Sequence, residues 1–427
     1  MLLSKFIYLL GCKRRNPTLL KQYDDLKKSE TWSREQLLEL QMIKLKKLLQ
    51  SAYSNTQYYR EMFDNLNIDV NDIKSIEDLK LLPILEKADI IKNSSQMRNH
   101  QCKNVFYSET SGSTGEPLVF YRGEEWDSAG RAAQLRGYSW YGIKPWDKNG
   151  YLWGHLYGSK FQLKTRLLDF LVNRFRLFSY DKQSVSKFAK RLNKATYLEG
   201  YSSMIYEVAK QINSENIKKR HLKMVKGTSE KIFDSYQCEV EKAFGVKMVS
   251  EYGAGESTLI AYECPHGNMH VVMENVIVEE ENGEIIVTNL NSFSMPIIRY
   301  RLGDSIILDR VKKCPCGMQH EIIADVVGRI GKTIYGKDGK YPSLTLYYIF
   351  KAMAFKTGNT INYQGIQTEK GKLKLLLDRE INSKEREVLL KECENYFGYD
   401  MDIVIAENQL NRDHTKKFQD FISEIKI

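Results

Sequence analysis

The sequence predicts an α/β protein in which a hinge joins a large mixed α/β N-terminal domain to a small α+β C-terminal domain. The chain has 427 residues, of which 42% are hydrophobic and 28% charged, values typical of a globular protein with two or three domains. Strand-like runs alternate with helical segments from about Phe106 to Ile323, as in mixed α/β cores. After Arg329 the pattern changes to short hairpins around one helix.

Residues 1–100 are expected to form a helical part of the larger domain. Ser33 and Gln36 have the spacing of a capping box, and apolar residues then recur at helical intervals from Leu38 to Leu49. We therefore expect helices across residues 17–65.

The N-terminal segment is apolar and then basic. Phe6–Leu10 comes before Lys13, Arg14 and Arg15, so a signal peptide is not expected, because its positive charges would precede the apolar run. No apolar stretch approaches the ~20 residues of a membrane-spanning helix. We interpret the segment as a helix packed on the body of the protein, with a weak peripheral contact to anionic lipid as the alternative.

The middle of the chain alternates between two periodicities. Apolar runs of strand length are separated by segments with helical spacing, and an Asn-Gly pair between two apolar runs predicts a β-hairpin. The expected strands are Tyr151–Leu156, Lys247–Tyr252, Val271–Val278 and Glu284–Thr288, the expected helices are Gln183–Leu192 and Ser203–Ile212, and the turn is Asn282-Gly283.

The last part of the chain predicts a compact unit of its own. Turns are expected at Lys337–Gly339 and Lys370-Gly371, a helix at Ser383–Phe397 and a strand at Asp402–Ala406. Together with a glycine-flanked hinge at Gly328–Gly331, this gives a large domain over residues 1–328 and a small mobile domain over residues 329–427.

Charge and cysteine content narrow the class of partner. The net charge is +10, from 64 basic and 54 acidic residues, but both signs are spread along the chain, which favours an anionic small molecule over nucleic acid. Seven cysteines without regular spacing favour a reduced, cytoplasmic protein in which a cysteine cluster would hold metal.

The most informative motif is rich in glycine and hydroxyl groups. It consists of Thr110, Ser111, Gly112, Ser113, Thr114 and Gly115. Glycines let backbone N–H groups approach a phosphate, and the hydroxyls add donors. The motif is not a Walker loop, because Pro117 and a strand-like run follow it where a helix would begin. We expect a tight hairpin loop that binds phosphate, with a flexible linker as the alternative.

Three further motifs could complete a nucleotide site. Tyr252 and Gly253 end a predicted strand, where an aromatic ring can stack on a base, and Glu256 could hold Mg²⁺ against phosphates. Asp304 follows a glycine and is suited to accept both hydroxyls of a ribose. Arg329 lies in a Gly-Arg pair at the hinge, which is weak evidence by itself.

Two cysteine-containing turns predict a metal site. Cys264 and His270 flank one turn, and Cys314 and Cys316 flank another. Two such arms can supply four ligands for tetrahedral zinc, and full protein coordination would make the site structural. His266 or His320 could substitute for one ligand, and four unrelated surface residues are the alternative. His155 and Tyr157 lie at the end of a predicted strand and could line an acid-binding pocket.

In the order and spacing of these motifs, the chain resembles the adenylate-forming (acyl-CoA synthetase-like) superfamily. Within it, the resemblance is to the phenylacetate–CoA ligase-like branch, which includes capsule-biosynthesis ligases, and it extends over nearly the whole chain. It implies that Thr110–Gly115 grips phosphate, that Tyr252 contacts adenine, that Glu256 associates with magnesium, that Asp304 binds ribose and that Arg329 lies at the hinge.

The resemblance also assigns residues that the motifs alone do not. It implies that Thr228, Ser229 and Glu230 line the adenine pocket, and that a C-terminal lysine polarises the reacting carboxylate. Lys417 is the better match because Phe418 follows it, but Lys416 stands where the family has glycine and remains a second candidate.

The predicted function is activation of a carboxylic acid, aryl or another small organic acid, with ATP and Mg²⁺, followed by transfer to coenzyme A. A structural Zn²⁺ and a monomer or homodimer are expected. The first alternative keeps the adenylation but transfers the acyl group to an amine or hydroxyl in capsular polysaccharide biosynthesis. The others are a zinc-knuckle nucleic-acid binder and a catalytically silent scaffold.

Overall fold

The computed structural model describes the chain in two domains with separate hydrophobic cores. It covers residues 2–109, 118–152, 159–178, 182–215, 217, 221–229, 232, 234–327, 333–359, 361, 363–410 and 421–425. The first core is built on a long sheet and its helices, and the second lies within residues 334–421.

The N-terminal part is helical, as predicted. Its helices are α1 (Leu2–Arg15), α2 (Leu19–Ser29), α3 (Arg34–Asn55), α4 (Gln57–Leu66) and α5 (Lys87–Met97), with short 3₁₀ turns η1 (Val70–Asp72) and η2 (Glu77–Leu81). The capping box is present, since the Ser33 side chain accepts from the Gln36 backbone and the Gln36 side chain accepts from the Ser33 backbone. The apolar face of α3, including Leu45 and Leu49, is fully buried, which explains the helical periodicity of the sequence.

A β-hairpin brackets the glycine-rich motif. Strand β1 (Val105–Glu109) pairs antiparallel with β2 (Val119–Gly123), and Glu109 lies opposite Val119 at the end of the pair next to the connecting residues. The predicted hairpin is therefore confirmed in its two strands, while residues 110–117 lie outside the described residues. Helix α6 (Glu124–Trp140) follows β2 directly.

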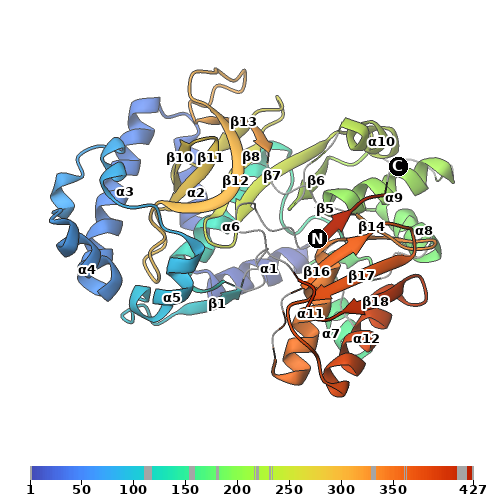
Figure 1. Ribbon diagram of the computed structural model, residues 1–427. Helices are drawn as coiled ribbons and strands as arrows, with labels where there is room; N and C mark the ends of the chain where they lie inside the picture. The colour runs from blue at the N-terminus through green and yellow to red at the C-terminus, as the bar shows by residue number, and fades with distance from the viewer. Residues whose placement is uncertain are drawn as a thin grey trace.

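Eleven of the described strands form one sheet in the order β10-β11-β12-β13-β9-β8-β7-β6-β5-β3-β4 (Figure 1). The strands are β3 (Asn149–Leu152), β4 (Arg174–Arg176), β5 (Tyr197–Tyr201), β6 (Met224–Thr228), β7 (Met248–Ala254), β8 (Thr258–Glu263), β9 (Met269–Val271), β10 (Val276–Glu281), β11 (Glu284–Asn289), β12 (Tyr300–Asp309) and β13 (Ile322–Val327). From β7 to β4 the sheet is parallel, and from β10 to β7 it is antiparallel.

Helices cover both faces of the parallel half. Leu198 and Val225 pack against α8 (Lys182–Leu192), α9 (Ser202–Ser214) and α10 (Asp234–Phe244). Their neighbours Tyr197 and Met224 pack on the opposite face, with Tyr138 of α6. Because side chains alternate along a strand, each strand contributes one face to each layer. The predicted α/β class is confirmed.

In this region one sequence prediction, the hairpin turn, is confirmed, and another, a single long strand, is wrong. The Asn282-Gly283 turn is confirmed, with both residues at positive φ (54° and 78°), as a two-residue hairpin between β10 and β11 requires. The run Val271–Val278 is not one strand, because β9 ends at Val271 and β10 begins at Val276. Between them lies a turn containing Glu274, a buried carboxylate whose ion pairs hold it in the core.

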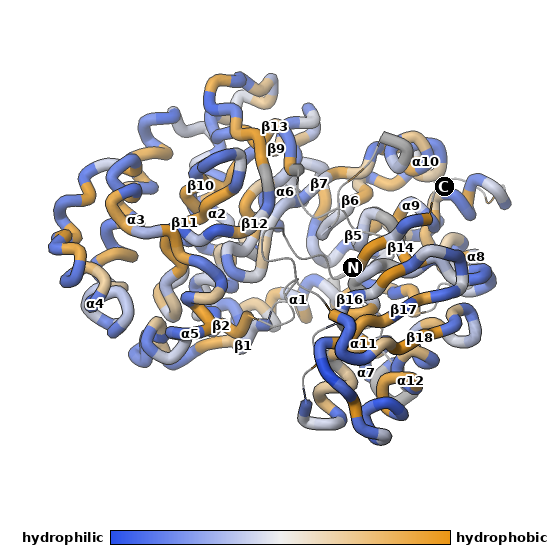
Figure 2. The backbone as a smooth tube through the Cα atoms, in the orientation of Figure 1, coloured by the Kyte–Doolittle hydropathy of each residue, from blue (hydrophilic) through white to orange (hydrophobic). Residues whose placement is uncertain are grey.

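The small domain has its own four-stranded sheet, in the order β18-β17-β16-β19, and a separate β-hairpin. Its elements are β14 (Thr333–Tyr335), β15 (Lys340–Pro342), α11 (Leu344–Thr357), β16 (Tyr363–Gln367), β17 (Lys372–Leu377), α12 (Ser383–Phe397), β18 (Asp402–Ala406) and β19 (Phe421–Ser423). The predicted helix and last strand agree with these bounds, and both predicted turns join paired strands. Strand β17 is mainly hydrophobic, with four leucines among its six residues (Figure 2).

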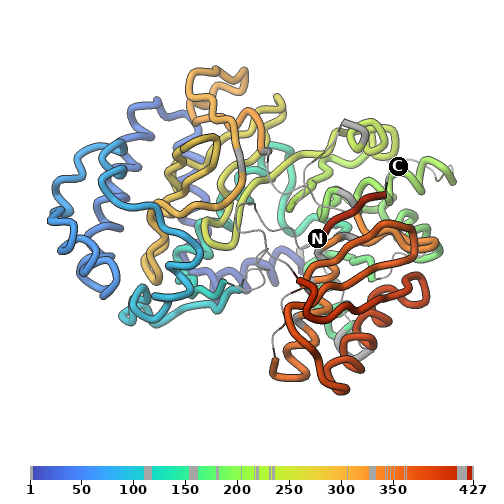
Figure 3. Tube along the Cα trace, viewed as in Figure 1, coloured from blue at the N-terminus to red at the C-terminus, as the bar shows by residue number. Residues whose placement is uncertain are grey.

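The small domain lies beside the parallel half of the sheet and away from α3 and α4 (Figure 3). Two described contacts join it to the larger domain. Lys340 Nζ lies 3.0 Å from Glu207 Oε1 on α9, and the hydroxyls of Tyr201 and Tyr348 are 3.3 Å apart.

Candidate functional site

Tyr252 and Asp304 meet although they come from strands that are not neighbours in the sheet. Tyr252 is in β7 and Asp304 in β12, and β8, β9 and β13 separate them in strand order. The Tyr252 hydroxyl nevertheless donates to Asp304 Oδ2 at 3.0 Å, so the sheet bends enough to bring these two side chains together. Two of the predicted nucleotide residues thus share one location.

The turn after β7 determines the position of Glu256, the predicted magnesium residue. A Cβ on Gly253 would come within 2.3 Å of the Thr258 carbonyl oxygen, so only glycine fits this close approach of β7 and β8. Glu256 lies in the turn between them and is buried, and the Tyr300 hydroxyl donates to its Oε1 at 3.4 Å. Because Tyr300 begins β12, the turn is tied to the strand that carries Asp304.

Thr228 and Ser229 lie beside these residues. Strand β6 ends at Thr228 and pairs in parallel with β7, with Gly227 opposite Ser250. The carboxyl ends of β6 and β7 therefore bring Thr228 next to the strand that carries Tyr252. Ser229 has φ = 66°, a left-handed conformation that is uncommon outside glycine and turns the chain sharply after the strand.

The remaining predicted nucleotide and substrate residues lie outside the described part of the chain. They are Thr110, Ser111, Gly112, Ser113, Thr114, Gly115, His155, Tyr157, Glu230, Arg329, Lys416 and Lys417. The described residues directly after the glycine-rich loop pack in the core of the larger domain. Leu118 and Phe120 belong to the same core as Tyr300, with Tyr252 packed against it.

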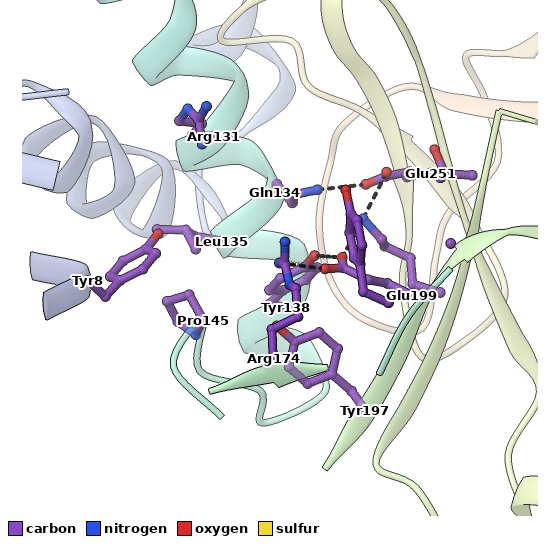
Figure 4. A pocket seen from close by; sticks show the side chains of 14 residues that line it. Tyr8, Arg131, Gln134, Leu135, Tyr138, Pro145, Arg174, Tyr197, Glu199 and Glu251 are labelled. Carbon is purple, nitrogen blue, oxygen red and sulfur yellow. Dashed lines mark hydrogen bonds and ion pairs between the residues drawn. The ribbon is translucent and has the colours of Figure 1, made fainter. Parts of the chain in front are cut away.

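A polar cavity of about 290 Å³ opens between α1, α6 and the parallel strands (Figure 4). It is lined by Tyr8, Arg131, Gln134, Leu135, Tyr138, Pro145, Tyr151, Arg174, Tyr197, Glu199, Gly200, Lys226, Thr228 and Glu251. Thr228 belongs both to this lining and to the predicted nucleotide residues, so the cavity reaches the end of β6 where nucleotide binding is expected.

The cavity wall is an ion-pair network. Lys226 Nζ lies 2.8 Å from Glu251 Oε1 and 3.2 Å from Glu199 Oε2. Arg174 approaches the other Glu199 oxygen at 3.0 Å, and the Tyr138 hydroxyl also donates to Glu199. Gln134 donates to Glu251 at 3.4 Å. No sequence motif points to these residues, because they come from five separate elements.

The network keeps its charges at neutral pH. Burial alone would lower the pKa of Lys226, but Glu251 and Glu199 raise it above the usual lysine value. Burial alone would raise the pKa of Glu199, but Lys226 and Arg174 hold it below the usual glutamate value. The wall is therefore ionic and hydrogen-bonding, and it can recognise polar groups on a ligand.

Cys264, His270, Cys314 and Cys316 come together, as the sequence predicts. Their ligand atoms all lie within 4.8 Å of one another, with Cys264 Sγ 3.6 Å from Cys314 Sγ and Cys316 Sγ 3.3 Å from His270 Nε2. Four sulfur ligands at ~2.3 Å from a tetrahedral ion would be about 3.8 Å apart. The four residues suit such an ion in number and in ligand type, and the separation of Cys264 Sγ and Cys314 Sγ is close to that spacing.

Each arm of this cluster is a tight turn with glycine at positive φ. Gly267 (φ 74°) donates to the Cys264 carbonyl, and Gly317 (φ 87°) donates to the Cys314 carbonyl. The side-chain amide of Asn268 donates to Cys314 Sγ at 3.1 Å. The two backbone bonds close the turns that carry Cys264 and Cys314, and the Asn268 side chain links one arm to the sulfur of the other.

The neutral state of the His270 ring agrees with a ligand role. Burial lowers the pKa of His270 to about 4, so the ring is neutral at pH 7, as a metal ligand requires. Burial raises the pKa of Cys316 to about 12, and a bound cation would reverse that effect. The two proposed substitutes are not in the cluster. His266 is exposed, and His320 instead lies 2.9 Å from Glu274.

Comparisons with known proteins agree with the predicted resemblance. Protein CapK of Staphylococcus aureus is 23% identical over 348 residues, covering 78% of this chain and 76% of that protein. The phenylacetate–coenzyme A ligase of Thermus thermophilus is 22% identical over 332 residues, covering 70% and 72%. No protein-family model matches the chain.

The fold is that of adenylate-forming ligases. The crystal structure of 2-hydroxyisobutyryl-CoA ligase in complex with 2-HIB-AMP and CoA superposes with a TM-score of 0.64 over 93% of this chain and 91% of that one, at 17% identity. The similarity covers both the large and the small domain. The predicted resemblance and the predicted two-part α/β fold are confirmed.

Proposed function

We propose that the protein is an ATP-dependent, AMP-forming acid–thiol ligase. In the first step a carboxylate oxygen attacks the α-phosphate of ATP, the bond to the β-phosphate breaks, and pyrophosphate leaves an acyl-adenylate. In the second step the thiol of coenzyme A attacks the acyl carbon, and AMP leaves as a thioester forms. The similarity to phenylacetate–coenzyme A ligase supports this reaction.

One observation carries the proposal. Tyr252 and Asp304 were both expected to bind one nucleotide, and they form a direct hydrogen bond although 52 residues separate them. The Asp304 carboxylate would accept the ribose hydroxyls, and the Tyr252 ring would lie against adenine. Thr228 and Ser229, on the neighbouring strand, would line the same nucleotide with Glu230.

The phosphate end of the site is proposed from the resemblance. Thr110–Gly115 would donate to the phosphates, and Glu256 would hold Mg²⁺, which would neutralise the leaving pyrophosphate. Lys417, with Lys416 as the alternative, would stabilise the charge that develops on the reacting oxygens. Rotation of the small domain about the hinge near Arg329 would then withdraw the lysine and admit the thiol.

We further propose that the acid is a small one that carries hydroxyl or amino groups. The cavity that reaches Thr228 is lined by Lys226, Glu251, Glu199 and Arg174, whereas an unsubstituted aryl or fatty acid needs an apolar wall. Its volume of about 290 Å³ is at the small end of the range for ligand pockets. His155 and Tyr157 stay proposed substrate residues.

A second acceptor is supported by a specific similarity. The chain matches protein CapK over most of both chains, and the branch it resembles includes capsule-biosynthesis ligases. An amine or hydroxyl on a sugar would then replace the thiol in the second step, while the adenylation stays the same. Detection of a thioester, with coenzyme A present and absent, separates the two acceptors.

We propose that Cys264, His270, Cys314 and Cys316 hold a structural Zn²⁺. The cluster uses four protein ligands and leaves no open position for substrate water. Its ligands are mainly buried and pack with Met318 and Ile322, which favours a structural role over nucleic-acid binding. Reduced thiols and the use of ATP and coenzyme A favour a cytoplasmic site of action.

The experiment that tests the proposal is a pyrophosphate-release screen. The purified protein is incubated with ATP, Mg²⁺ and a panel of aryl, fatty, hydroxy and amino acids. We expect release above background with at least one acid, strongest among small polar acids, and thioester formation when coenzyme A is added. A folded, ATP-binding protein that releases no pyrophosphate with any acid would instead support a catalytically silent scaffold.

A further inference from the structure

Helix α1 carries an exposed apolar stripe. Leu3, Phe6 and Leu10 are 65%, 63% and 56% exposed, and their spacing places them on one side of the helix. The opposite side packs on the larger domain, where Tyr8 lines the polar cavity and lies against Trp146, with ring centroids 5.9 Å apart. The helix is therefore docked, with an apolar face toward solvent.

Helix α7 (Ser159–Leu171) repeats this pattern. Leu163, Leu167 and Phe170 are 71%, 60% and 75% exposed and share one side, and the adjacent Leu168 is exposed as well. Helices α1 and α7 contact one another, and Figure 2 draws both with hydrophobic positions. Single exposed apolar residues are ordinary, but a concentration on two neighbouring helices marks an interaction surface.

The same two helices are basic on their exposed sides. On α1, Lys13 and Arg14 are exposed and the helix contains no acidic residue. On α7, Lys164 and Arg166 are exposed.

The acidic residue of α7 does not offset these charges. Asp169 is buried and forms an ion pair with Arg176 at 3.1 Å. We call the exposed apolar and basic residues of the two helices the α1–α7 surface. They are Leu3, Phe6, Leu10, Lys13, Arg14, Leu163, Lys164, Arg166, Leu167, Leu168 and Phe170.

We propose that the α1–α7 surface docks the protein on an anionic membrane. Apolar side chains on helices lying in the interface plane enter the headgroup region, and flanking Lys and Arg residues pair with anionic headgroups. Charge complementarity selects this occupant, because a second copy docking through the same surface would bring the basic residues of both copies together. No described helix is long and apolar enough to span the bilayer.

The test is sedimentation of the full chain with lipid vesicles. Vesicles of phosphatidylcholine with about 30% phosphatidylglycerol are compared with pure phosphatidylcholine, at about 50 mM and about 500 mM salt. We expect binding to the anionic vesicles that weakens at the higher salt concentration. Lys13→Glu with Arg14→Glu should lower the partition coefficient at least about tenfold, because each basic residue near the surface contributes about fivefold.

The matched control for charge is on another helix. Lys46→Glu with Lys47→Glu on α3 makes the same change in net charge at exposed positions, and it should alter vesicle binding less than twofold. For the apolar part, Leu167→Ser with Phe170→Ser should lower binding at least about tenfold. Leu81→Ser, at a 52% exposed leucine outside the surface, is its control. Melting curves establish that every variant is folded.

Three results would overturn the proposal. The first is no sedimentation of the wild-type chain with anionic vesicles. The second is equal loss of binding in the α3 control and the α1 variant, which would mean that only net charge matters. The third is a wild-type dimer by light scattering that becomes a monomer in Leu167→Ser with Phe170→Ser, which would make the surface an interface between copies of this chain.

Discussion

Replacing Asp304 by Asn tests the nucleotide site with the smallest change in shape. If Asp304 accepts the ribose hydroxyls, the substitution turns one of two acceptor oxygens into a donor and removes the negative charge. A hydrogen bond to a charged group contributes about 1.5–3 kcal/mol. Losing one should therefore raise the KM for ATP by about 10- to 150-fold, with little change in the KM for the acid.

The assay is ATP–pyrophosphate exchange over a range of ATP concentrations. Asp309→Asn, on the same strand, is the matched control, because that carboxylate only accepts from the backbone of Val311 and Lys312, as an amide oxygen can. Its KM for ATP should stay within about twofold of wild type. An Asp304→Asn protein that melts like wild type and keeps the wild-type KM for ATP would refute the placement of the nucleotide.

Three other changes have defined outcomes. Lys417→Ala should lower the rate of adenylation by about 10²–10³ without a change in melting temperature, whereas Lys416→Ala should have a minor effect in the same exchange assay, and the reverse order would move the role to Lys416. Cys316→Ser should release bound zinc, measured by atomic absorption, and lower the melting temperature, whereas Cys238→Ser, at an exposed cysteine, should do neither. Arg136→Met removes the fully buried partner of a buried glutamate and should lower the free energy of unfolding in urea by about 3–5 kcal/mol at pH 7. Because the ion pair holds the pKa of that glutamate well below 4.5, the native pair contributes above this pH, and the loss should shrink as the pH falls below it.

Local sequence patterns predicted most of the helices, strands and turns, because residues close together in the sequence determine where these elements begin and end. The capping box at Ser33 and the positive φ of Asn282 and Gly283 depend on residues within a few positions of each other. The Cys/His cluster was predicted for the same reason, since each arm is a tight turn that places its own ligands. Only the meeting of the two arms needed the tertiary fold.

The break between β9 and β10 shows where such patterns fail. Val271–Val278 reads as a continuous strand except for Glu274 and Asn275, and the structure turns at that point. Glu274 is buried with Arg136 and His320, and the Asn275 side chain donates to the Ala129 carbonyl. None of these partners is near in sequence, so no window of the sequence could reveal that the two polar residues redirect the chain.

The candidate site also contains some residues that were predicted from the sequence and others that only the tertiary structure reveals. The pairing of Tyr252 with Asp304 was expected from the resemblance, not from periodicity, because β7 and β12 are not adjacent in strand order. The polar network around Glu199 was not expected at all. In the sequence, Glu199 and Lys226 are isolated charges, each within an apolar strand. They pair because the parallel register of β5 and β6 places them side by side.

This register also explains why the proposed acid site can be polar inside a stable fold. Residues that point to α8, α9 and α10, such as Leu198 and Val225, form an apolar layer, and the alternate residues Glu199 and Lys226 point to the α6 side. Removing either charge alone would leave the other with fewer partners in a buried place, at a cost of several kcal/mol. An apolar pair would avoid that cost, so stability alone does not favour this network. We therefore attribute it to recognition, and an enzyme that preferred phenylacetate to every polar acid would contradict that reasoning.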